Sequence, residues 1–232
     1  MAKHACMRLL AAADFALATP PVALDAAAIH LWYFRDVGKA AHSTLLTRLL
    51  AGYLHTPHAD LVIERDAHGK PHLVGANAAR VQFNLSHSGS SMIVALSRDQ
   101  AVGVDIEDGL RDRPWLALAE RYFARAEFGR LSRLPEATLA EAFIDLWSCK
   151  EAVLKALGRG IAFGLHRLRF EWDARGQLAH LAGIDAEAGD AADWQVVRLA
   201  PAAGVVGAVA WRGPPRPLLA FAALTADFPD ER

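Results

Sequence analysis

The alternating residues 101–108, AVGVDIED, restrict the folds that are open to this chain. Side chains of a β-strand point to opposite faces in turn. One face would therefore carry the apolar side chains of Val102, Val104 and Ile106. Asp105 and Glu107 would lie on the other face, roughly 7 Å apart along the strand. Two carboxylates this close repel each other unless a cation lies between them, so the segment predicts a core strand whose acidic face needs a cation.

A long helical pattern in residues 135–160 carries a second group of polar residues. Trp147, Glu151 and Lys155 are spaced four apart, so they share one face of the helix. The neighbouring apolar stripe consists of Phe143, Leu146, Val153 and Leu157. Two interpretations stay open here. Glu151 and Lys155 form either a surface ion pair worth about 0.3–0.5 kcal/mol or part of a functional site. The acids of 101–108 either mark a turn or belong to that site.

The remaining patterns predict a mixture of strands and helices. Apolar or alternating runs predict strands at 28–34, 81–97 (two strands around a turn), 167–172, 194–199, 205–211 and 217–224. Helical spacing predicts one helix over 40–54 and a broken one over 114–131. Residues 61–74 read as two short extended pieces around a turn, whereas the first 30 residues have no clear pattern. We therefore expect an α+β chain with two halves of similar size that meet near residue 105.

Composition limits the environment and the partners. A chain of 232 residues with 53% hydrophobic and 22% charged residues is expected to be globular. A net charge of -1 gives no basic field for nucleic acid or an anionic membrane, and no apolar run is long enough to span a bilayer. Cys6 and Cys149 lack metal-ligand spacing and fit a reducing compartment. The start of the chain imitates a signal peptide, but Asp14 interrupts its apolar run, so we expect a cytoplasmic protein without nucleic-acid or membrane partners.

Several motifs occur in an order that resembles a known enzyme family. VGVDIE at 102–107 is followed by WSCKEAVLK at 147–155. Upstream lie AHSTLL (41–46), HGKPHL (68–73) and FNLSHSG (83–89). The set resembles the signature of the Sfp-type 4'-phosphopantetheinyl transferases over roughly residues 40–225. The fold that this resemblance implies has two similar α+β halves with a pseudo-two-fold relation and an active site in the cleft between them.

The resemblance divides the roles between the halves. Residues 1–104 would supply the elements that bind the nucleotide of coenzyme A, and residues 105–232 the metal site and the catalytic helix. The implied activity moves the 4'-phosphopantetheine arm of coenzyme A to a serine of an apo acyl-carrier or peptidyl-carrier protein. The products are holo-carrier and adenosine 3',5'-bisphosphate, and the enzyme is expected to act as a monomer.

Metal-binding and catalytic residues are implied at the matching motif positions. The resemblance assigns Asp105, Glu107 and Glu151 to Mg²⁺, with Mn²⁺ as a substitute ion. Mg²⁺ prefers oxygen ligands and accepts carboxylates together with substrate phosphates, so it is the cation expected between the acids. Glu151 is the implied base for the serine proton, with Lys150 as the competing candidate. Lys150 and Lys155 complete the implied catalytic set as partners of the phosphates.

The resemblance also implies contacts to coenzyme A. They are Thr44, Lys70, Pro71, Ser86, His87, Lys150 and Lys155. Among these, Ser86 and His87 are expected at the 3'-phosphate, and Lys70 and Pro71 at the adenosine. The family carries basic residues near its first helix that are thinned out in this chain. The candidates to replace them are Arg35, Lys39 and Arg48.

Residues 110–128 have two interpretations. In the first, this segment docks an acidic carrier protein through Arg111, Arg113 and Trp115. In the second, it is an ordinary helix that buries Leu116, Leu118 and Phe123. Two other functions also stay open: a metal-dependent phosphohydrolase that uses the same acids, and a non-catalytic homologue that binds coenzyme A or a carrier protein.

Overall fold

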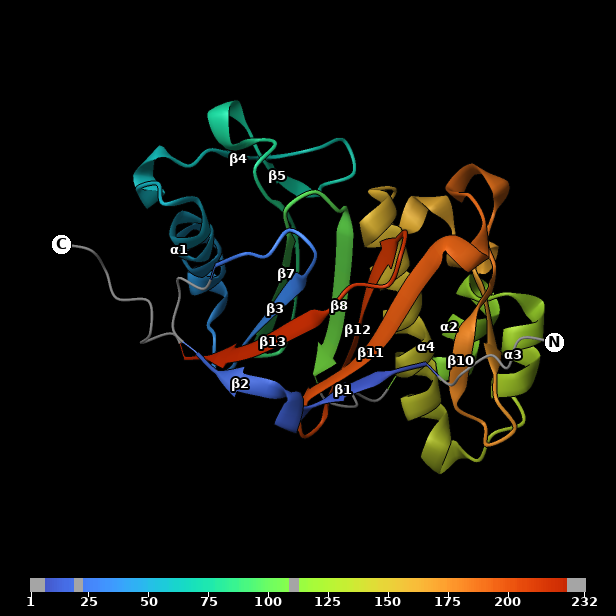
Figure 1. Cartoon of the computed structure of the whole chain (residues 1–232). Helices are drawn as coiled ribbons and strands as arrows, with labels where there is room; N and C mark the ends of the chain where they lie inside the picture. The colour runs from blue at the N-terminus through green and yellow to red at the C-terminus, as the bar shows by residue number, and fades with distance from the viewer. Residues whose placement is uncertain (1–6, 19–22, 109–112, 225–232) are drawn as a thin grey trace.

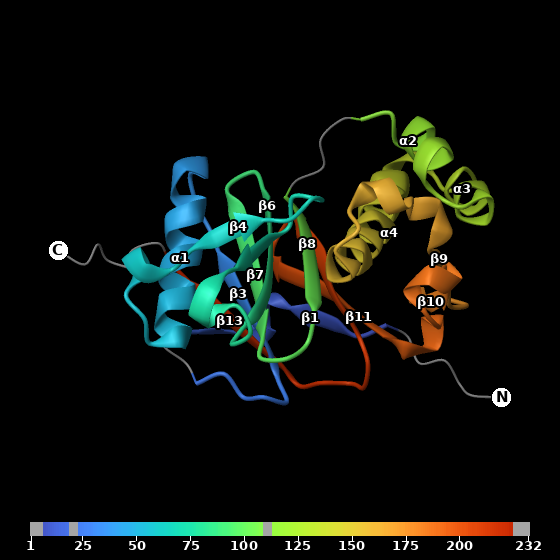
Figure 2. The same cartoon turned by 90° about the horizontal axis from the view of Figure 1, so that it is seen from above.

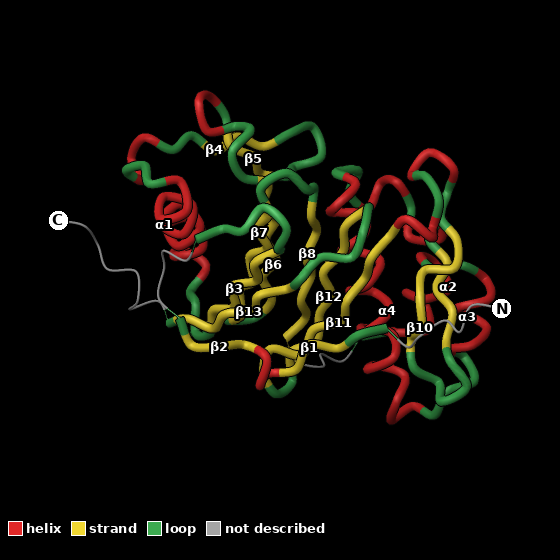
Figure 3. The backbone as a smooth tube through the Cα atoms, in the orientation of Figure 1, coloured by secondary structure: helices red, strands yellow, loops and turns green. Residues whose placement is uncertain are grey.

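The structure, a computed structural model, describes residues 7–18, 23–108 and 113–224. Two mixed β-sheets run through the middle of the molecule, with helices at either end (Figures 1 and 3). The first sheet has five strands in the order β2 (Phe15–Leu17), β13 (Leu218–Ala223), β3 (Ile29–Phe34), β7 (Ser91–Ser97) and β6 (Gln82–Ser88). The second has four strands in the order β1 (Leu9–Ala11), β11 (Trp194–Ala202), β12 (Val205–Arg212) and β8 (Val102–Asp108). The expected α+β class is confirmed.

Helix α1 (His42–Leu54) packs on the first sheet through one apolar side. Its buried leucines are Leu45, Leu46, Leu49, Leu50 and Leu54. They share a core with Trp32 of β3 and Val94 of β7. After α1, β4 (Ile63–Arg65) and β5 (Pro71–Leu73) form a small hairpin whose turn uses Gly69 at φ 83°. Glycine suits this position because side chains disfavour positive φ. The two predicted extended pieces are confirmed.

Helix α4 (Glu136–Leu157) packs against β8 and β12 of the second sheet. Helices α2 (Trp115–Tyr122) and α3 (Arg125–Leu131) lie on the other side of α4, as Figure 2 shows. The helix ends at Gly158, which adopts the left-handed conformation at φ 71°. A hairpin of β9 (Arg169–Trp172) and β10 (Leu178–Gly183) completes this core. The broken helix and the long helix were both predicted.

Short 3₁₀ helices join these elements: η1 (Ala12–Asp14), η2 (Lys39–Ala41), η3 (His58–Asp60), η4 (Gly75–Asn77), η5 (Ile161–Phe163), η6 (Leu165–Arg167), η7 (Ala186–Ala188) and η8 (Ala191–Asp193). The strands β1, β2 and β10 were not predicted. β1 and β2 have three residues each and bury one residue each, which is too little for an alternating pattern. Among the described residues, no helix is long and apolar enough to cross a membrane.

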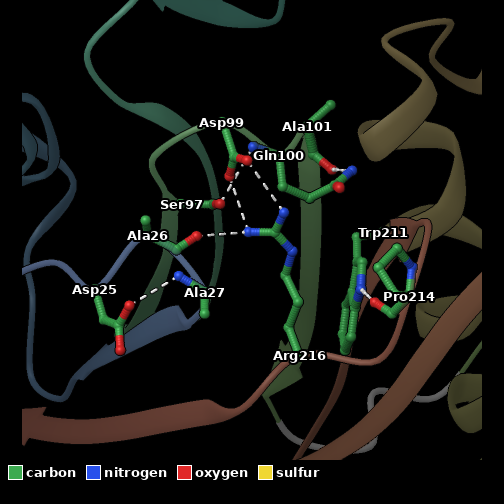
Figure 4. A network of polar contacts seen from close by, with 10 residues as sticks. All are labelled: Asp25, Ala26, Ala27, Ser97, Asp99, Gln100, Ala101, Trp211, Pro214 and Arg216. Carbon is green, nitrogen blue, oxygen red and sulfur yellow. Dashed lines mark hydrogen bonds and ion pairs between the residues drawn. The ribbon is translucent and has the colours of Figure 1, made fainter.

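Strands from the first and last parts of the chain connect the two sheets. β1 pairs with β11, β2 pairs with β13, and β13 returns from the second half to pair with β3. Arg216 anchors the returning segment, because its guanidinium donates to Asp99 Oδ1 (2.9 Å), Asp99 Oδ2 (3.3 Å) and Ala26 O (2.9 Å), as Figure 4 shows. Trp211 Nε1 donates to Pro214 O at 2.9 Å just before it. A division between residues 104 and 105 would fall inside β8.

Candidate active site

A cavity of about 600 Å³, here named the acidic cleft, is lined by β6, β8, α4 and the β4–β5 hairpin. It brings together most of the residues predicted for the site: Lys70, Pro71, Ser86, His87, Asp105, Glu107, Glu151 and Lys155. Trp147 also lines it, so the predicted shared face of Trp147, Glu151 and Lys155 is confirmed. Thr44 and Lys150 are not among its lining residues.

Gly103 sets the distance between β8 and α4. A Cβ atom at this position would lie 2.1 Å from Ala152 O and 2.3 Å from Ala156 N. The backbone of α4 therefore rests directly on the strand, which only glycine permits. Asp105 lies two residues further along the same face of β8, so the close approach brings Glu151 beside it. On the opposite face of β8, the predicted apolar residues Val102, Val104 and Ile106 are buried.

Asp105 is held by two neighbours from different elements. Its side chain is buried, and Oδ1 accepts hydrogen bonds from Ser86 Oγ (2.9 Å) and Lys155 Nζ (2.7 Å). Lys155 Nζ also donates to Val104 O at 3.1 Å and to Ser86 Oγ at 3.0 Å. The sequence predicted a metal ion as the cation beside the acids. In the structure, the nearest positive charge to Asp105 is the ammonium group of Lys155.

Glu107 contacts the end of β6. Ser88 Oγ donates to Glu107 Oε2 at 3.1 Å. Burial raises the pKa of the Glu107 carboxyl, and the negative charge of Asp105 raises it further. Two residues before Ser86, Asn84 Oδ1 accepts a hydrogen bond from Val104 N at 2.8 Å. Polar side chains of β6 therefore join the facing edges of the two sheets beside the acids.

Glu151 points into the acidic cleft from α4 and is only 7% exposed. Burial, followed by repulsion from Asp105, raises the pKa of Glu151 to about 7. Its Oε1 atom is buried and has no hydrogen-bond partner within the part of the chain that the structure describes. A buried carboxylate oxygen without a partner is costly, so this atom is suited to a bound cation or donor.

The acids provide donor atoms that suit a divalent metal ion, although their side chains are not arranged as a complete set of ligands. Within the described ranges, no three His, Cys, Asp or Glu side chains are grouped closely enough to hold a metal ion as they stand. Asp105 Oδ1 is engaged by Lys155, and Glu107 Oε2 is engaged by Ser88. However, Asp105 Oδ2 and Glu151 Oε1 are buried and unpartnered among the described residues. Carboxylate oxygens are the ligands that Mg²⁺ prefers, so this donor set fits the ion.

Lys150 does not reach the acidic cleft, which corrects its predicted role as a phosphate partner or base. The residue is 0% exposed, and its ammonium group donates to Glu127 Oε2 (2.5 Å), Leu165 O (2.9 Å) and Leu168 O (2.5 Å). Burial lowers the pKa of Lys150. All three donors are engaged with Glu127, Leu165 and Leu168, none of which lines the acidic cleft, so none remains for a substrate.

A second cavity of about 610 Å³, here named the basic cavity, adjoins the acidic cleft and shares Arg65, Pro71, Leu85 and His87 with it. Lys39 and His42 also line it. Of Arg35, Lys39 and Arg48, the candidates to replace the family's basic residues near the first helix, Lys39 is the one that lines this cavity. The rings of His42 and His87 lie against each other, tilted by 31°, with centroids 4.5 Å apart. Burial, and then the neighbouring His87, lowers the pKa of His42. The buried His42 Nε2 has no partner among the described residues, so it is a free group for a ligand.

Thr44 is exposed on α1 and is not part of the basic cavity. Ser43 and Thr47, one turn apart on the helix, line the cavity instead. The structure therefore does not bring Thr44 to the other predicted contacts. The helix was predicted correctly, but its rotation against β6 depends on packing that the motif does not encode.

Lys70 reaches across the cleft to the other half of the chain. Its Nζ donates to Lys155 O at 2.8 Å and to Val102 O at 3.5 Å. The last carbonyls of a helix lack partners within the helix, and they favour a cation. Burial lowers the pKa of Lys70. The β4–β5 hairpin, which also carries Pro71, is therefore tied to the end of α4 beside the site.

A smaller cavity of about 170 Å³ with aromatic walls also adjoins the acidic cleft, and Glu107 lines both. Arg113 and Trp115, predicted to dock a carrier protein, line this aromatic cavity. Arg111 lies outside the described residues. Phe123 is buried, as the alternative interpretation predicted. The burial interpretation was wrong for Leu116, which is 40% exposed, and Leu118 is only half-buried. The docking interpretation stays a prediction.

Two family models match most of the chain. Residues 14–99 match the family model described as 4'-phosphopantetheinyl transferase, N-terminal, and residues 101–208 match that of the 4'-phosphopantetheinyl transferase superfamily. Over 171 residues, the chain is 31% identical to the 4'-phosphopantetheinyl transferase HetI of Nostoc sp. (strain PCC 7120), which covers 73% of this chain and 68% of that protein. The chain belongs to the 4'-phosphopantetheinyl transferase superfamily.

Two further members of the superfamily illustrate the range of the similarity. The 4'-phosphopantetheinyl transferase psf-1 of Bacillus pumilus is 37% identical over 131 residues, which is 54% of each chain. The L-aminoadipate-semialdehyde dehydrogenase-phosphopantetheinyl transferase of Xenopus laevis is 31% identical over 154 residues, or 61% of this chain and 50% of that protein. The chain spans about half the length of most of the curated relatives it matches.

Some residues in and around this candidate site were not singled out from the sequence. Asn84 and Ser88 alternate with Ser86 on β6, so the period-two pattern of the FNLSHSG motif could have indicated them. Glu127 and His42 had no such local signal. Glu127 contacts Lys150 across 23 positions of sequence, and His42 contacts His87 across the gap between α1 and β6.

Proposed function

We propose that this chain transfers the 4'-phosphopantetheine arm of coenzyme A to a serine of an apo acyl-carrier or peptidyl-carrier protein. The products would be holo-carrier and adenosine 3',5'-bisphosphate. The observation that carries the proposal is the convergence of Asp105, Glu107, Glu151 and Lys155 on one cavity that adjoins a basic one. This arrangement suits a substrate with a diphosphate at one point and a further phosphate at its nucleotide end.

We infer that Asp105, Glu107 and Glu151 hold Mg²⁺, for which Mn²⁺ can substitute. When bound, the ion neutralises charge on the diphosphate and on the leaving phosphate. The buried oxygens Asp105 Oδ2 and Glu151 Oε1 support this assignment, since both lack a partner among the described residues. Lys155 would then donate to phosphate oxygens instead of to Asp105, which it contacts at 2.7 Å.

Glu151 is the proposed base for the carrier serine. Its carboxylate has two oxygens, so one can contact the metal ion while the other receives the proton from the serine hydroxyl. Its place in the acidic cleft, among the groups that would surround the diphosphate, supports this role. The buried and fully engaged ammonium of Lys150 argues against the competing base.

The basic cavity is the proposed site of the 3'-phosphate. The rings of His87 and His42 lie against each other there, and Lys39 lines the same cavity. An imidazole or ammonium group donates well to a phosphate oxygen. Ser86 is engaged with Asp105 and Lys155, which supports a role nearer the diphosphate. Lys70 lines the acidic cleft and Pro71 lines both cavities, and these two residues remain the proposed contacts to the adenosine.

The aromatic cavity is the proposed contact region for the carrier protein. It lies beside Glu107, so a carrier docked there would present its serine to the diphosphate. Arg113 at its rim would attract the acidic surface of a carrier, and Trp115 would pack against apolar side chains. Because residues from both halves of one chain line the acidic cleft, we also propose a monomer, acting in the reducing cytoplasm that the cysteine content favours.

Intact-mass measurement of a carrier protein tests the proposed function. An apo-carrier incubated with coenzyme A, Mg²⁺ and this chain should gain the mass of one phosphopantetheine arm. Glu151→Gln should remove the gain while the fold persists, since the change keeps the size of the side chain. Consumption of coenzyme A without mass gain would indicate a phosphohydrolase, and binding without consumption would indicate a non-catalytic homologue. Either result would refute the proposal.

A further inference from the structure

Glu151 occupies a position that its own contacts do not secure. The side chain is 7% exposed, and Oε1 accepts no hydrogen bond from any described residue. Asp105 and Glu107 line the same cavity. Repulsion between these carboxylates favours any rotation of α4 that turns Glu151 away from them. On the same face of α4, the contact of Lys155 with Asp105 at 2.7 Å holds the helix against β8, but it gives Glu151 itself no hydrogen bond. Contacts on other sides of the helix are therefore also needed to orient Glu151.

Lys150, the preceding residue, makes three polar contacts with groups outside α4. Its ammonium group donates to Glu127 Oε2 at 2.5 Å and to the carbonyl oxygens of Leu165 and Leu168 at 2.9 and 2.5 Å. It also lies 5.1 Å from the centroid of the Phe123 ring. The three donors of the ammonium group are all used, and the side chain has no exposure to water.

Backbone groups hold the Glu127 carboxylate in place. Its Oε2 accepts from Ala124 N at 2.9 Å, at the start of α3, and its Oε1 accepts from Phe170 N of β9 at 2.8 Å. The carboxylate is thus bound to two backbone groups as well as to Lys150. The Glu127–Lys150 pair, here named the latch, joins α3, α4, η6 and β9 at a single buried point.

Consecutive residues on a helix point about 100° apart. When the latch holds Lys150 toward η6 and β9, Glu151 can point only toward the acidic cleft. The contact of α4 with Gly103 fixes how close the helix lies to β8, and Lys155 holds the face toward Asp105. The latch restrains the rotation of the helix from a second face. We propose that Glu127 and Lys150 are positioning residues that orient Glu151 toward Asp105 and Glu107 for metal binding. This inference rests on the proposed function.

A purely stabilising role is the alternative. Buried ion pairs are poor sources of net stability, because removing two charges from water offsets much of their attraction, and apolar replacements are often neutral. Their best-attested use is to select one arrangement of packed elements over its competitors. A stabilising pair would change the unfolding temperature alone. A positioning pair would also change the metal affinity of a chain that remains folded.

Mn²⁺ binding to the protein without coenzyme A, followed by electron paramagnetic resonance, separates these roles. The first variant is Glu127→Gln. The second combines Glu127→Gln with Lys150→Met, so that both charges of the latch are removed and neither is left buried without its partner. Asp145→Asn is the matched control, because it breaks another ion pair of α4, to Arg198 at 2.7 Å. All are compared at a temperature at which circular dichroism shows them folded.

We expect both latch variants to bind Mn²⁺ about 10- to 100-fold more weakly than the wild-type chain, as changes behind metal ligands do. Their kcat for carrier modification should fall more than their KM for coenzyme A rises. Asp145→Asn should unfold at a lower temperature but bind Mn²⁺ normally. Folded latch variants with wild-type Mn²⁺ affinity would overturn the inference alone. A wild-type chain that binds no Mn²⁺ would refute the proposed metal site and the latch with it.

Discussion

Replacing Gly103 with alanine should drive α4 away from β8. The new Cβ would lie 2.1 Å from Ala152 O, 2.3 Å from Ala156 N and 2.9 Å from Lys155 C, all of them backbone atoms. Non-bonded atoms in ordinary contact are about 3.5 Å apart, so the helix has to withdraw by more than ~1 Å. No flexible side chain can absorb the clash, because the helix backbone itself is in contact.

The expected cost follows from this displacement. Overpacking of a core typically costs about 1–3 kcal/mol of unfolding free energy. In a chain of this length, each kcal/mol lowers the melting temperature by about 2–4 °C. A shift of ~1 Å at a catalytic group can cost on the order of 100-fold in rate. Gly103→Ala should therefore lower the melting temperature by several degrees and kcat far more than its stability loss alone explains.

Thermal unfolding and carrier modification, followed by intact mass, measure the two effects. Gly129→Ala is the matched control, because a Cβ there meets nothing within 4 Å and the residue lies inside α3. Alanine favours a helix over glycine by roughly 0.5–1 kcal/mol, so this control should be neutral or more stable, with normal activity. If Gly103→Ala kept both the wild-type melting temperature and kcat, the proposed contact between β8 and α4 would be wrong.

Two other perturbations probe the charges of the site. Burial raises the pKa of Glu151 from 4.5 to about 7, so its stabilising contribution is full below pH 4.5 and is lost as the pH rises through about 7. Without metal, Glu151→Gln should therefore have a higher melting temperature than the wild type at pH 8 and the same melting temperature at pH 4. Mg²⁺ should raise the melting temperature of the wild type only. A lower melting temperature of the variant at pH 8 would contradict this. His42→Ala should raise the KM for coenzyme A about tenfold, as loss of a hydrogen bond to a charged group does, and leave that for dephospho-coenzyme A unchanged. His72→Ala, exposed on β5 and outside both cavities, is its control, and equal rises for the two substrates would exclude His42 from the phosphate site.

The faces of the secondary structure elements were predictable from local periodicity. The alternation of 101–108 placed Asp105 and Glu107 together, and the spacing of four placed Glu151 and Lys155 on one side of α4. Both rules depend only on backbone geometry within one element. The motif order then brought the two elements to one site, which the acidic cleft bears out.

The contacts between elements were not predictable in the same way. Lys150 was assigned to the phosphates from its motif position, but a carboxylate from α3 and two carbonyls beyond α4 hold it inside the protein. The contact of Lys155 with Asp105 was not predicted either, and its role at the phosphates stays a prediction. These outcomes depend on distant residues that meet only after packing, so no pattern within one segment contains them.

The position of a bound metal ion tests the central claim most directly. Crystals grown with coenzyme A and Mn²⁺ would locate the ion by its anomalous scattering. We predict one peak in the acidic cleft, in contact with carboxylate oxygens of Asp105, Glu107 and Glu151 and with the diphosphate of coenzyme A. A peak that leaves Glu151 out of contact, or an ion held only by the diphosphate, would contradict the account.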